Sequence, residues 1–341
     1  MTHRRFSAAS AILLYCLSLP AAAVEVVVLS DLDTTINWLE SEAWWGEAKR
    51  AQQLSVPRAL ITSTGPNWRE TSKNIPVAQK KEVFYRFLLP LILHANEMVM
   101  DRRARLEAMA EQLHGGVALA PDDLAWLADV ARLLRIAHSD GSASLGDSPA
   151  EVIKVINEAL YKLDEVPAGL ALGQAAYESG YGTSRFAAEG NALFGQWTFG
   201  GEGLVPAKQR GELGDHRIAA FDWPFDSVRG YFINLSSHPA YEPFRKLRAE
   251  QRRLGQPLDS VALANGLIRY SERGQQYVDT LQGIIRFNNL SIADTARFRD
   301  EPMRFIVIAS GENEALELQE KIAQGQKSGE LERIVARMQL D

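Results

Sequence analysis

The sequence predicts a mainly α-helical protein, and three observations carry that prediction. Apolar residues recur at spacings of three and four along most of the chain, which is the period of an amphipathic helix. Proline and aspartate stand where several of these patterns begin, and glycine stands where the clearest one ends. Only residues 195–222 are glycine-rich and irregular, and they have room for one short β-hairpin, with 203–210 pairing with 216–221.

The first 23 residues have the pattern of a signal peptide. Arg4 and Arg5 precede an apolar run over 8–20, and three alanines at 21–23 supply small residues for cleavage. We therefore expect an exported, periplasmic protein whose mature chain begins at Val24.

The single cysteine, Cys16, lies inside this segment. Its removal would leave the mature chain without a thiol for disulfides, catalysis or metal binding. A lipid anchor on Cys16 is the alternative, but bulky Tyr15 precedes it where a lipoprotein signal carries a small residue.

Composition narrows the classes of partner. The chain has 37 Lys and Arg against 43 Asp and Glu, a net charge of -6, which does not favour nucleic acid because phosphate binding needs a concentrated basic face. No segment after the signal approaches the ~20 apolar residues of a membrane span. No P-loop, Gly-x-Ser-x-Gly elbow or His-Glu-x-x-His motif occurs and the histidines are dispersed, so we expect neither a cofactor nor a metal.

The chain divides at a small, polar stretch over 138–150. Residues 24–140 read as a helical accessory domain, in which Pro90 is expected to kink or split the longest helix. Residues 141–296 form the second domain. The tail, 297–341, has no assigned role, and its apolar segment at 305–310 fits either a strand or a buried helical turn.

Glu178 is the leading candidate for chemistry. Pro167 suits the first turn of a helix that Gly180 ends, so Glu178 stands at the helix C-terminus. The negative end of the helix dipole and aromatic neighbours should both raise its pKa. A protonated glutamate is what glycosidic cleavage needs, since the leaving sugar oxygen takes up a proton. The competing interpretation is an ordinary surface glutamate.

The run LALGQAAYESGYGTSRFAAEGNALFGQW, at 170–197, resembles the signature of the glucosaminidase domain of glycoside hydrolase family 73. In that family a helix ends in Glu-Ser-Gly-aromatic-Gly, here 178–182, and an asparagine, here Asn191, shortly precedes Phe-Gly, here Phe194 and Gly195. A second block at 269–290 resembles the closing helix of the family, with Tyr270 and Tyr277 at the expected spacing.

The stretch KKEVFYRFLLPLILHANEMVMDRRARL, at 80–106, resembles the accessory half of the Bax-like subgroup of this family. With it the resemblance covers residues from about 50 to about 290. It implies a lysozyme-like catalytic domain with one small β-hairpin beside the helical N-terminal domain, an endo-β-N-acetylglucosaminidase activity, and the β-1,4-linked glycan strands of peptidoglycan as partner.

The resemblance also assigns site residues. Glu178 becomes the general acid, and the expected substrate contacts are Tyr181, Asn191, Phe194, Trp197, Tyr270 and Tyr277, with aromatic rings packing on flat sugar faces. For Tyr270 and Tyr277 a place in the core fits equally well.

Many members of the wider family carry a second carboxylate in a Thr-x-Glu-Tyr context, and this chain lacks that context. The corresponding stretch, 205–222, offers Glu212 and Asp215, with Glu202 earlier, and Glu212 is our candidate. An inverting reaction needs a base ~6.5–9.5 Å from the acid, whereas a substrate N-acetyl group, steadied by Tyr277, can serve as internal nucleophile. Two rival functions stay open: a lytic transglycosylase, and a non-catalytic protein that binds or scaffolds the cell wall.

Overall fold

The computed structural model describes residues 25–46, 53–63, 65, 67–136, 145–146, 148–198, 203–204 and 217–323. It confirms the mainly α-helical prediction: helices account for most of this part of the chain, and its strands are five residues long or shorter. The expected signal peptide, with Cys16 and the cleavage site, lies outside the described residues.

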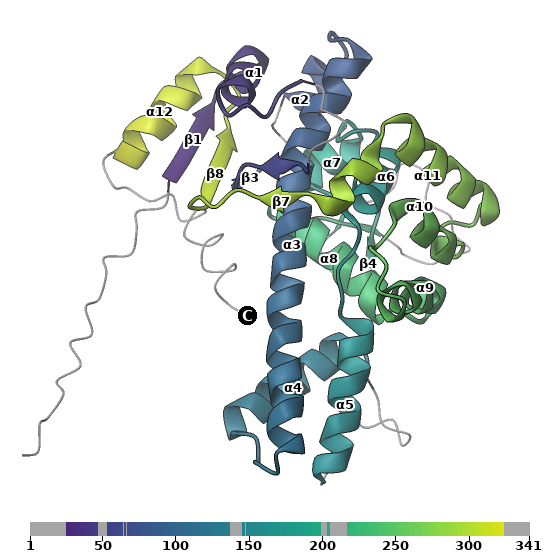
Figure 1. The fold of residues 1–341 in the computed structure, drawn as a ribbon. Helices are drawn as coiled ribbons and strands as arrows, with labels where there is room; N and C mark the ends of the chain where they lie inside the picture. The colour runs from purple at the N-terminus through teal and green to yellow at the C-terminus, as the bar shows by residue number, and fades with distance from the viewer. Residues whose placement is uncertain are drawn as a thin grey trace, which may run out of the picture.

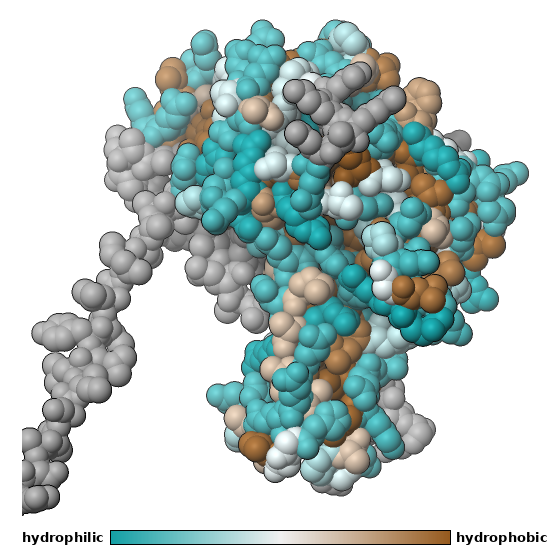
Figure 2. All heavy atoms as spheres, viewed as in Figure 1, coloured by the Kyte–Doolittle hydropathy of each residue, from teal (hydrophilic) through white to brown (hydrophobic). Residues whose placement is uncertain are grey.

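A single long helix, α3 (Val77–His114), runs through the molecule (Figure 1). Its lower half packs with α4 (Pro121–Leu133) and α5 (Pro149–Lys162), and Figure 2 shows hydrophobic residues in the seam between the helices there. Pro90 does not split α3, contrary to one expectation. A proline leaves the carbonyl four residues earlier without its helical donor, and here the Trp44 indole N–H donates to that carbonyl, of Arg86, at 3.1 Å.

Contrary to the expectation that no segment after the signal resembles a membrane span, the same helix is long and apolar enough to cross a membrane, judged by length and composition alone. In the structure, however, 67% of its most apolar window is buried. The covered side chains include Phe87, Leu91 and Ile92, which pack into the core. Such burial is typical of a core helix, whose apolar side chains pack against the rest of the protein.

Two ends of the described chain meet in one parallel sheet. Strand β8 (Arg304–Ile308) lies between β1 (Glu25–Leu29) and β3 (Ala59–Ile61), and a second pair joins β2 (Ser55–Val56) to β7 (Arg297–Phe298). The helices α1 (Leu32–Ser41) and α12 (Glu312–Ala323) follow β1 and β8 (Figure 1).

The segment 305–310 is therefore mostly strand, and its apolar run suits a central strand flanked on both sides. An ion pair strengthens the junction, since the Arg304 guanidinium donates to both carboxyl oxygens of Glu42 at 2.7 Å. The prediction that residues 24–140 are purely helical is incomplete, because β1, β2 and β3 lie in this range. Strands of two to five residues are too short to show a period in the sequence, and their pairing partners lie more than 240 positions away.

The second half of the chain packs around α6 (Ala168–Ser179), which contacts α3, α11 (Gln275–Phe287) and the short turn η4 (Leu290–Thr295). The helix expected to end at Gly180 is α6. The remaining elements of this half are α7 (Arg185–Gly190), α8 (Pro224–Ser237), η2 (Pro239–Tyr241), α9 (Glu242–Arg253), α10 (Ser260–Leu263), η3 (Ala264–Leu267), α11 (Gln275–Phe287) and η4 (Leu290–Thr295). A short helix, α2 (Trp68–Thr71), precedes α3.

The expected hairpin is present as part of a three-stranded antiparallel sheet. Strand β6 (Arg217–Ala219) pairs with β5 (Gly203–Leu204), as predicted, and on its other side with β4 (Trp197–Thr198). The residues between β5 and β6, which include Glu212 and Asp215, lie outside the described part of the chain, as does Glu202.

Candidate active site

Helix α6 carries Glu178 from the core to the partly exposed end of the helix. Every residue from Ala168 to Ala176 is buried, whereas Tyr177 and Glu178 in the last turn are partly exposed. The helix ends at Gly180, whose φ of 58° and ψ of 46° lie in the left-handed region that glycine adopts without strain. Glu178 therefore stands where the apolar helix gives way to the loop.

The loop after Glu178 is held by its own small side chains. The Ser179 hydroxyl donates to the carbonyl of Ala175 at 2.6 Å and accepts from the N–H of Gly182 at 2.8 Å. Ser184 then caps α7 by accepting from the N–H of Ala187. These bonds are local, so the serine and glycine positions of the motif fix the path of the chain on the far side of Glu178.

Gly195, of the Phe-Gly pair, closes the other side of the carboxyl. Its φ of 62° is left-handed, and a Cβ built on it would stand 3.4 Å from Oε2 of Glu178. Backbone therefore approaches Glu178 where a larger residue would crowd the carboxyl and strain the turn.

Burial raises the pKa of Glu178 to about 7, against a hydrogen bond from Tyr277 that lowers it. No cation contributes to this balance among the described residues. A carboxyl with this pKa holds its proton in a large fraction of molecules near neutral pH, which suits a general acid.

A chain of hydrogen bonds orients the donor to Glu178. The Tyr231 hydroxyl donates to the side-chain oxygen of Gln174 at 2.5 Å, and the Gln174 amide donates to the Tyr277 oxygen at 2.9 Å. Because the Tyr277 oxygen accepts from Gln174, its own hydrogen is left for the carboxyl of Glu178, the hydrogen bond that lowers that residue's pKa.

Sequence reasoning missed Tyr231 and gave Gln174 no role. Gln174 is fully buried one turn before Glu178, on the same face of α6. A glutamine at that spacing inside an otherwise apolar helix was a readable signal, because a buried amide must find partners. Tyr231 comes from α8, and nothing in its local pattern connects it with Glu178.

Two expected substrate contacts lie in the core beneath the carboxyl. Phe194 is 1% exposed and stacks on Tyr231 with ring centroids 4.0 Å apart, so sugar cannot reach its ring in this structure. Tyr277 is fully buried and stacks on Tyr270 at 5.6 Å. The partly exposed Tyr270 donates its hydroxyl to the carbonyl of Phe194 at 2.9 Å. These rings form a wall beneath the Glu178 carboxyl.

Asn191 shapes the loop. Its φ of 48° ends α7 in the left-handed region, and its side-chain amide donates to the carbonyls of Phe221 at 3.0 Å and Asp222 at 3.2 Å. The nitrogen is thereby committed to backbone partners that join α7 to the chain after β6.

Tyr181 and Trp197 are the remaining expected contacts. Tyr181 lies against α3, with its ring edge-on to Phe84 at 5.8 Å and Tyr85 at 5.9 Å, and stays partly exposed. Trp197 belongs to β4, where its backbone pairs with Ile218, and its side chain is outside the described part of the structure. Glu212 lies outside as well, so its relation to Glu178 stays a prediction.

Within the described residues no group of three or more His, Cys, Asp and Glu side chains is placed to hold a metal ion. The partly exposed carboxyl of Glu178, with its raised pKa, is a group that can transfer a proton.

Comparison with known proteins agrees with the motif. Residues 154–290 match the family model described as mannosyl-glycoprotein endo-beta-N-acetylglucosaminidase, a segment that contains Glu178, Gln174 and Tyr277. The chain is 29% identical over 233 residues to Protein bax of Escherichia coli (strain K12), which is 68% of this chain and 77% of that protein. No solved structure matches. The resemblance predicted from the sequence is confirmed, and it supports a glycosidase-type enzyme at the level of class.

Proposed function

We propose that the protein is an exported endo-β-N-acetylglucosaminidase that hydrolyses β-1,4 bonds in the glycan strands of peptidoglycan, with Glu178 as its general acid. The observation that carries the proposal is the buried carboxyl with a pKa of about 7 at the end of α6. The family match over 154–290 supports the substrate class, a glycan containing N-acetylglucosamine.

In the proposed reaction the protonated Glu178 donates to the glycosidic oxygen as its bond to the anomeric carbon breaks, so the leaving sugar departs as a neutral alcohol. Tyr277 accepts from Gln174 and donates its own hydrogen to the Glu178 carboxyl, so it holds the carboxyl in place and has no hydrogen left for a substrate N-acetyl group. The buried tyrosine therefore acts through Glu178.

The candidate for the second catalytic group lies outside the residues that the structure describes. We propose Glu212 as the base that activates water, with a substrate N-acetyl group as the alternative nucleophile. Glu212→Gln should lower turnover less than Glu178→Gln does. Turnover equal to wild type would transfer the role to the substrate or to another residue.

The decisive experiment compares wild type and Glu178→Gln on the same purified sacculi, with release of glycan and melting temperature measured together. Glutamine keeps the shape and removes the proton, so release should fall by ~10²–10⁴ or more while the fold is retained. Glu189→Gln is the matched control, because Glu189 lies on the neighbouring α7, pairs with Arg185 at 3.1 Å and is half exposed.

Several outcomes would contradict the proposal. If folded Glu178→Gln releases as much glycan as wild type, Glu178 is not the general acid. Anhydro-sugar ends in the mass spectra would indicate a lytic transglycosylase. Binding to sacculi without any new reducing ends indicates a non-catalytic wall-binding protein.

Export is tested separately by the intact mass of the protein recovered from the periplasm. The proposal requires a chain that begins near Val24 and carries no lipid. A mass that includes residues 1–23, or a lipid on Cys16, contradicts it.

A further inference from the structure

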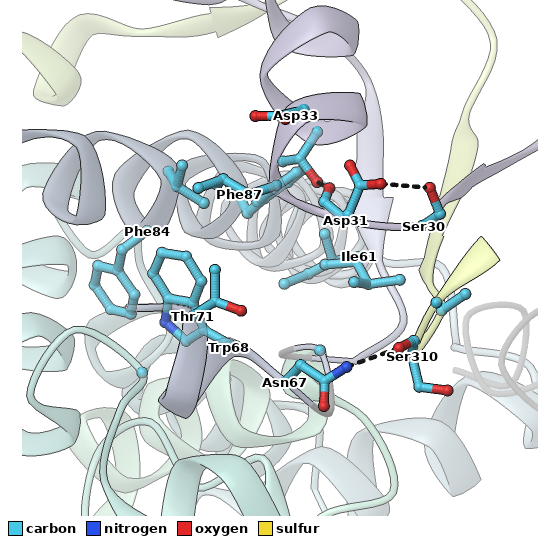
Figure 3. Close-up of a pocket in the computed structure, with 18 of the residues that line it drawn as sticks. Ser30, Asp31, Asp33, Ile61, Asn67, Trp68, Thr71, Phe84, Phe87 and Ser310 are labelled. Carbon is cyan, nitrogen blue, oxygen red and sulfur yellow. Dashed lines mark hydrogen bonds between the residues drawn. The ribbon is translucent and has the colours of Figure 1, made fainter. Parts of the chain in front are cut away.

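A cavity of about 560 Å³ is lined in part by Gly182 and Leu193, which belong to the segment between α6 and β4. It opens where β1, β3 and β8 end, and α3 forms its long side (Figure 3). Ligands bind preferentially at the carboxyl ends of parallel strands, and a cavity of this volume accommodates a molecule of ordinary ligand size.

The cavity is apolar inside. Phe84, Phe87 and Ile61 are each at most 8% exposed, and Leu88 and Leu193 are each 2% exposed. Figure 3 shows Trp68 and Phe84 together at one end, with Thr71 beside them. An apolar or aromatic body would replace water in this space favourably.

The mouth is acidic. Asp31, Asp33 and Glu312 line it from the first turns of α1 and α12 or the residue before, and all three are exposed. The backbone N–H of Thr34 lowers the pKa of Asp31, which keeps this carboxyl ionised at neutral pH. No lysine or arginine occurs among the described residues that line the cavity.

The dipoles of α1 and α12 do not cancel the negative charge of the cavity mouth. Each helix N-terminus contributes about half a positive charge, so α1 and α12 together bring about one. Three carboxylates outweigh it, and the mouth stays negative by about two charges. Anionic ligands are therefore disfavoured, and a cation at the mouth is attracted.

We propose that this cavity is a second ligand site, separate from Glu178, that takes an organic cation: an apolar or aromatic body seated against Phe84 and Phe87, with its ammonium group at Asp31 and Asp33.

The cavity adjoins the loop that follows Glu178, through Trp68 and Gly182. The Trp68 indole N–H donates to the carbonyl of Tyr181 at 2.9 Å, and a Cβ on Gly182 would stand 3.3 Å from that nitrogen. These residues follow Glu178 by three and four positions. A ligand packed on Trp68 therefore touches the loop that ends the catalytic helix.

The test measures binding of three probes of one shape to the mature protein by titration calorimetry: 4-phenylbutylamine, 4-phenylbutanol and 4-phenylbutanoate. The amine should bind about fivefold to tenfold more tightly than the alcohol, because one partly exposed ion pair contributes about this factor to affinity. The carboxylate should bind most weakly. Binding is read directly, so the result does not depend on glycan hydrolysis.

Two variants separate charge from shape. Asparagine caps helices as well as aspartate does, so Asp31→Asn combined with Asp33→Asn should keep α1 and bring the amine down to the affinity of the alcohol. Thr71→Phe should weaken all three probes by filling the aromatic end. Glu70→Gln is the control, since Glu70 lies on the same short helix, pairs with Lys73 at 2.7 Å and does not line the cavity.

The proposal is overturned if the amine shows no binding at about 10 mM, the weak limit of measurable affinity. It is also overturned if the alcohol or the carboxylate binds as tightly as the amine, or if the folded double asparagine variant keeps the preference for the amine. Melting temperatures of the variants establish that each is folded.

Discussion

Glu178 and Asp164 are both withdrawn from solvent in the same half of the protein, and their pKa values move in opposite directions. Burial acts to raise the pKa of Asp164, but the hydrogen bond from Arg252 and the charges of Arg248 and Arg252 outweigh it, and the pKa is lowered. Among the described residues only the Tyr277 hydroxyl opposes the effect of burial on Glu178, and the pKa rises to about 7. The presence or absence of a cation decides which buried carboxyl keeps its proton.

Asp294 is an intermediate case at the other end of α6. Its carboxyl accepts from the N–H of Gly169 at 2.9 Å and from the N–H and hydroxyl of Ser260. Burial still raises its pKa, and these neutral donors lower it in part. Asp294, from η4, is thus committed to three donors at the N-terminus of α6, whereas Glu178 at the C-terminus of α6 has one phenolic donor among the described residues.

The largest stability effect is expected at the ion-paired carboxyl. Asp164→Asn should destabilise the fold by about 3–5 kcal/mol, because it removes a charge that compensates the fully buried Arg248 and pairs with Arg252 at 2.9 Å. Urea denaturation measures it. Asp129→Asn is the control: its pair with Arg132 is about 70% exposed on both sides and should contribute under about 1 kcal/mol.

The next effect is the pH dependence of stability at Glu178. Between pH ~4.5 and ~7 the unfolded chain releases a proton that the folded chain keeps, so wild type should lose up to roughly 3 kcal/mol of unfolding free energy as pH rises through this window. Glu178→Gln removes that loss. The variant should therefore gain stability relative to wild type at pH 8 compared with pH 4, in paired urea titrations at the two pH values.

Asp164 should show the opposite sign in the same experiment. Its lowered pKa means that its contribution is present above the unfolded pKa, near 4, and is lost as pH falls. If wild type and Glu178→Gln differ by the same amount at both pH values, folding does not raise the pKa of Glu178, and the contrast with Asp164 is contradicted.

The smallest expected effect concerns Tyr277. Tyr277→Phe removes the hydrogen bond that lowers the pKa of Glu178, so the fall in glycan release at alkaline pH should move to higher pH. Tyr270→Phe is the matched control, because that hydroxyl donates to the carbonyl of Phe194. An alkaline limb that stays in place or moves to lower pH in Tyr277→Phe would mean that Tyr277 does not hold the carboxylate.

The sequence by itself determined what local contacts decide. The mainly helical character follows from periodicity, and the position of Glu178 at a helix end follows from Gly180 two residues later. The loop bonds of Ser179 and Ser184 span at most four residues, so the motif contained them. That is why the resemblance and the helix end could be predicted without any knowledge of packing.

Only the tertiary structure decided the rest. Strand β8 meets β1 and β3 across more than 240 residues, and Tyr231 reaches Gln174 from another helix. Phe194 became a wall residue because Tyr231 stacks on it. The pKa of Glu178 depends on how fully it is desolvated and on which charges are absent around it. Periodicity reports which face of an element is apolar, whereas desolvation and pairing depend on what that face meets.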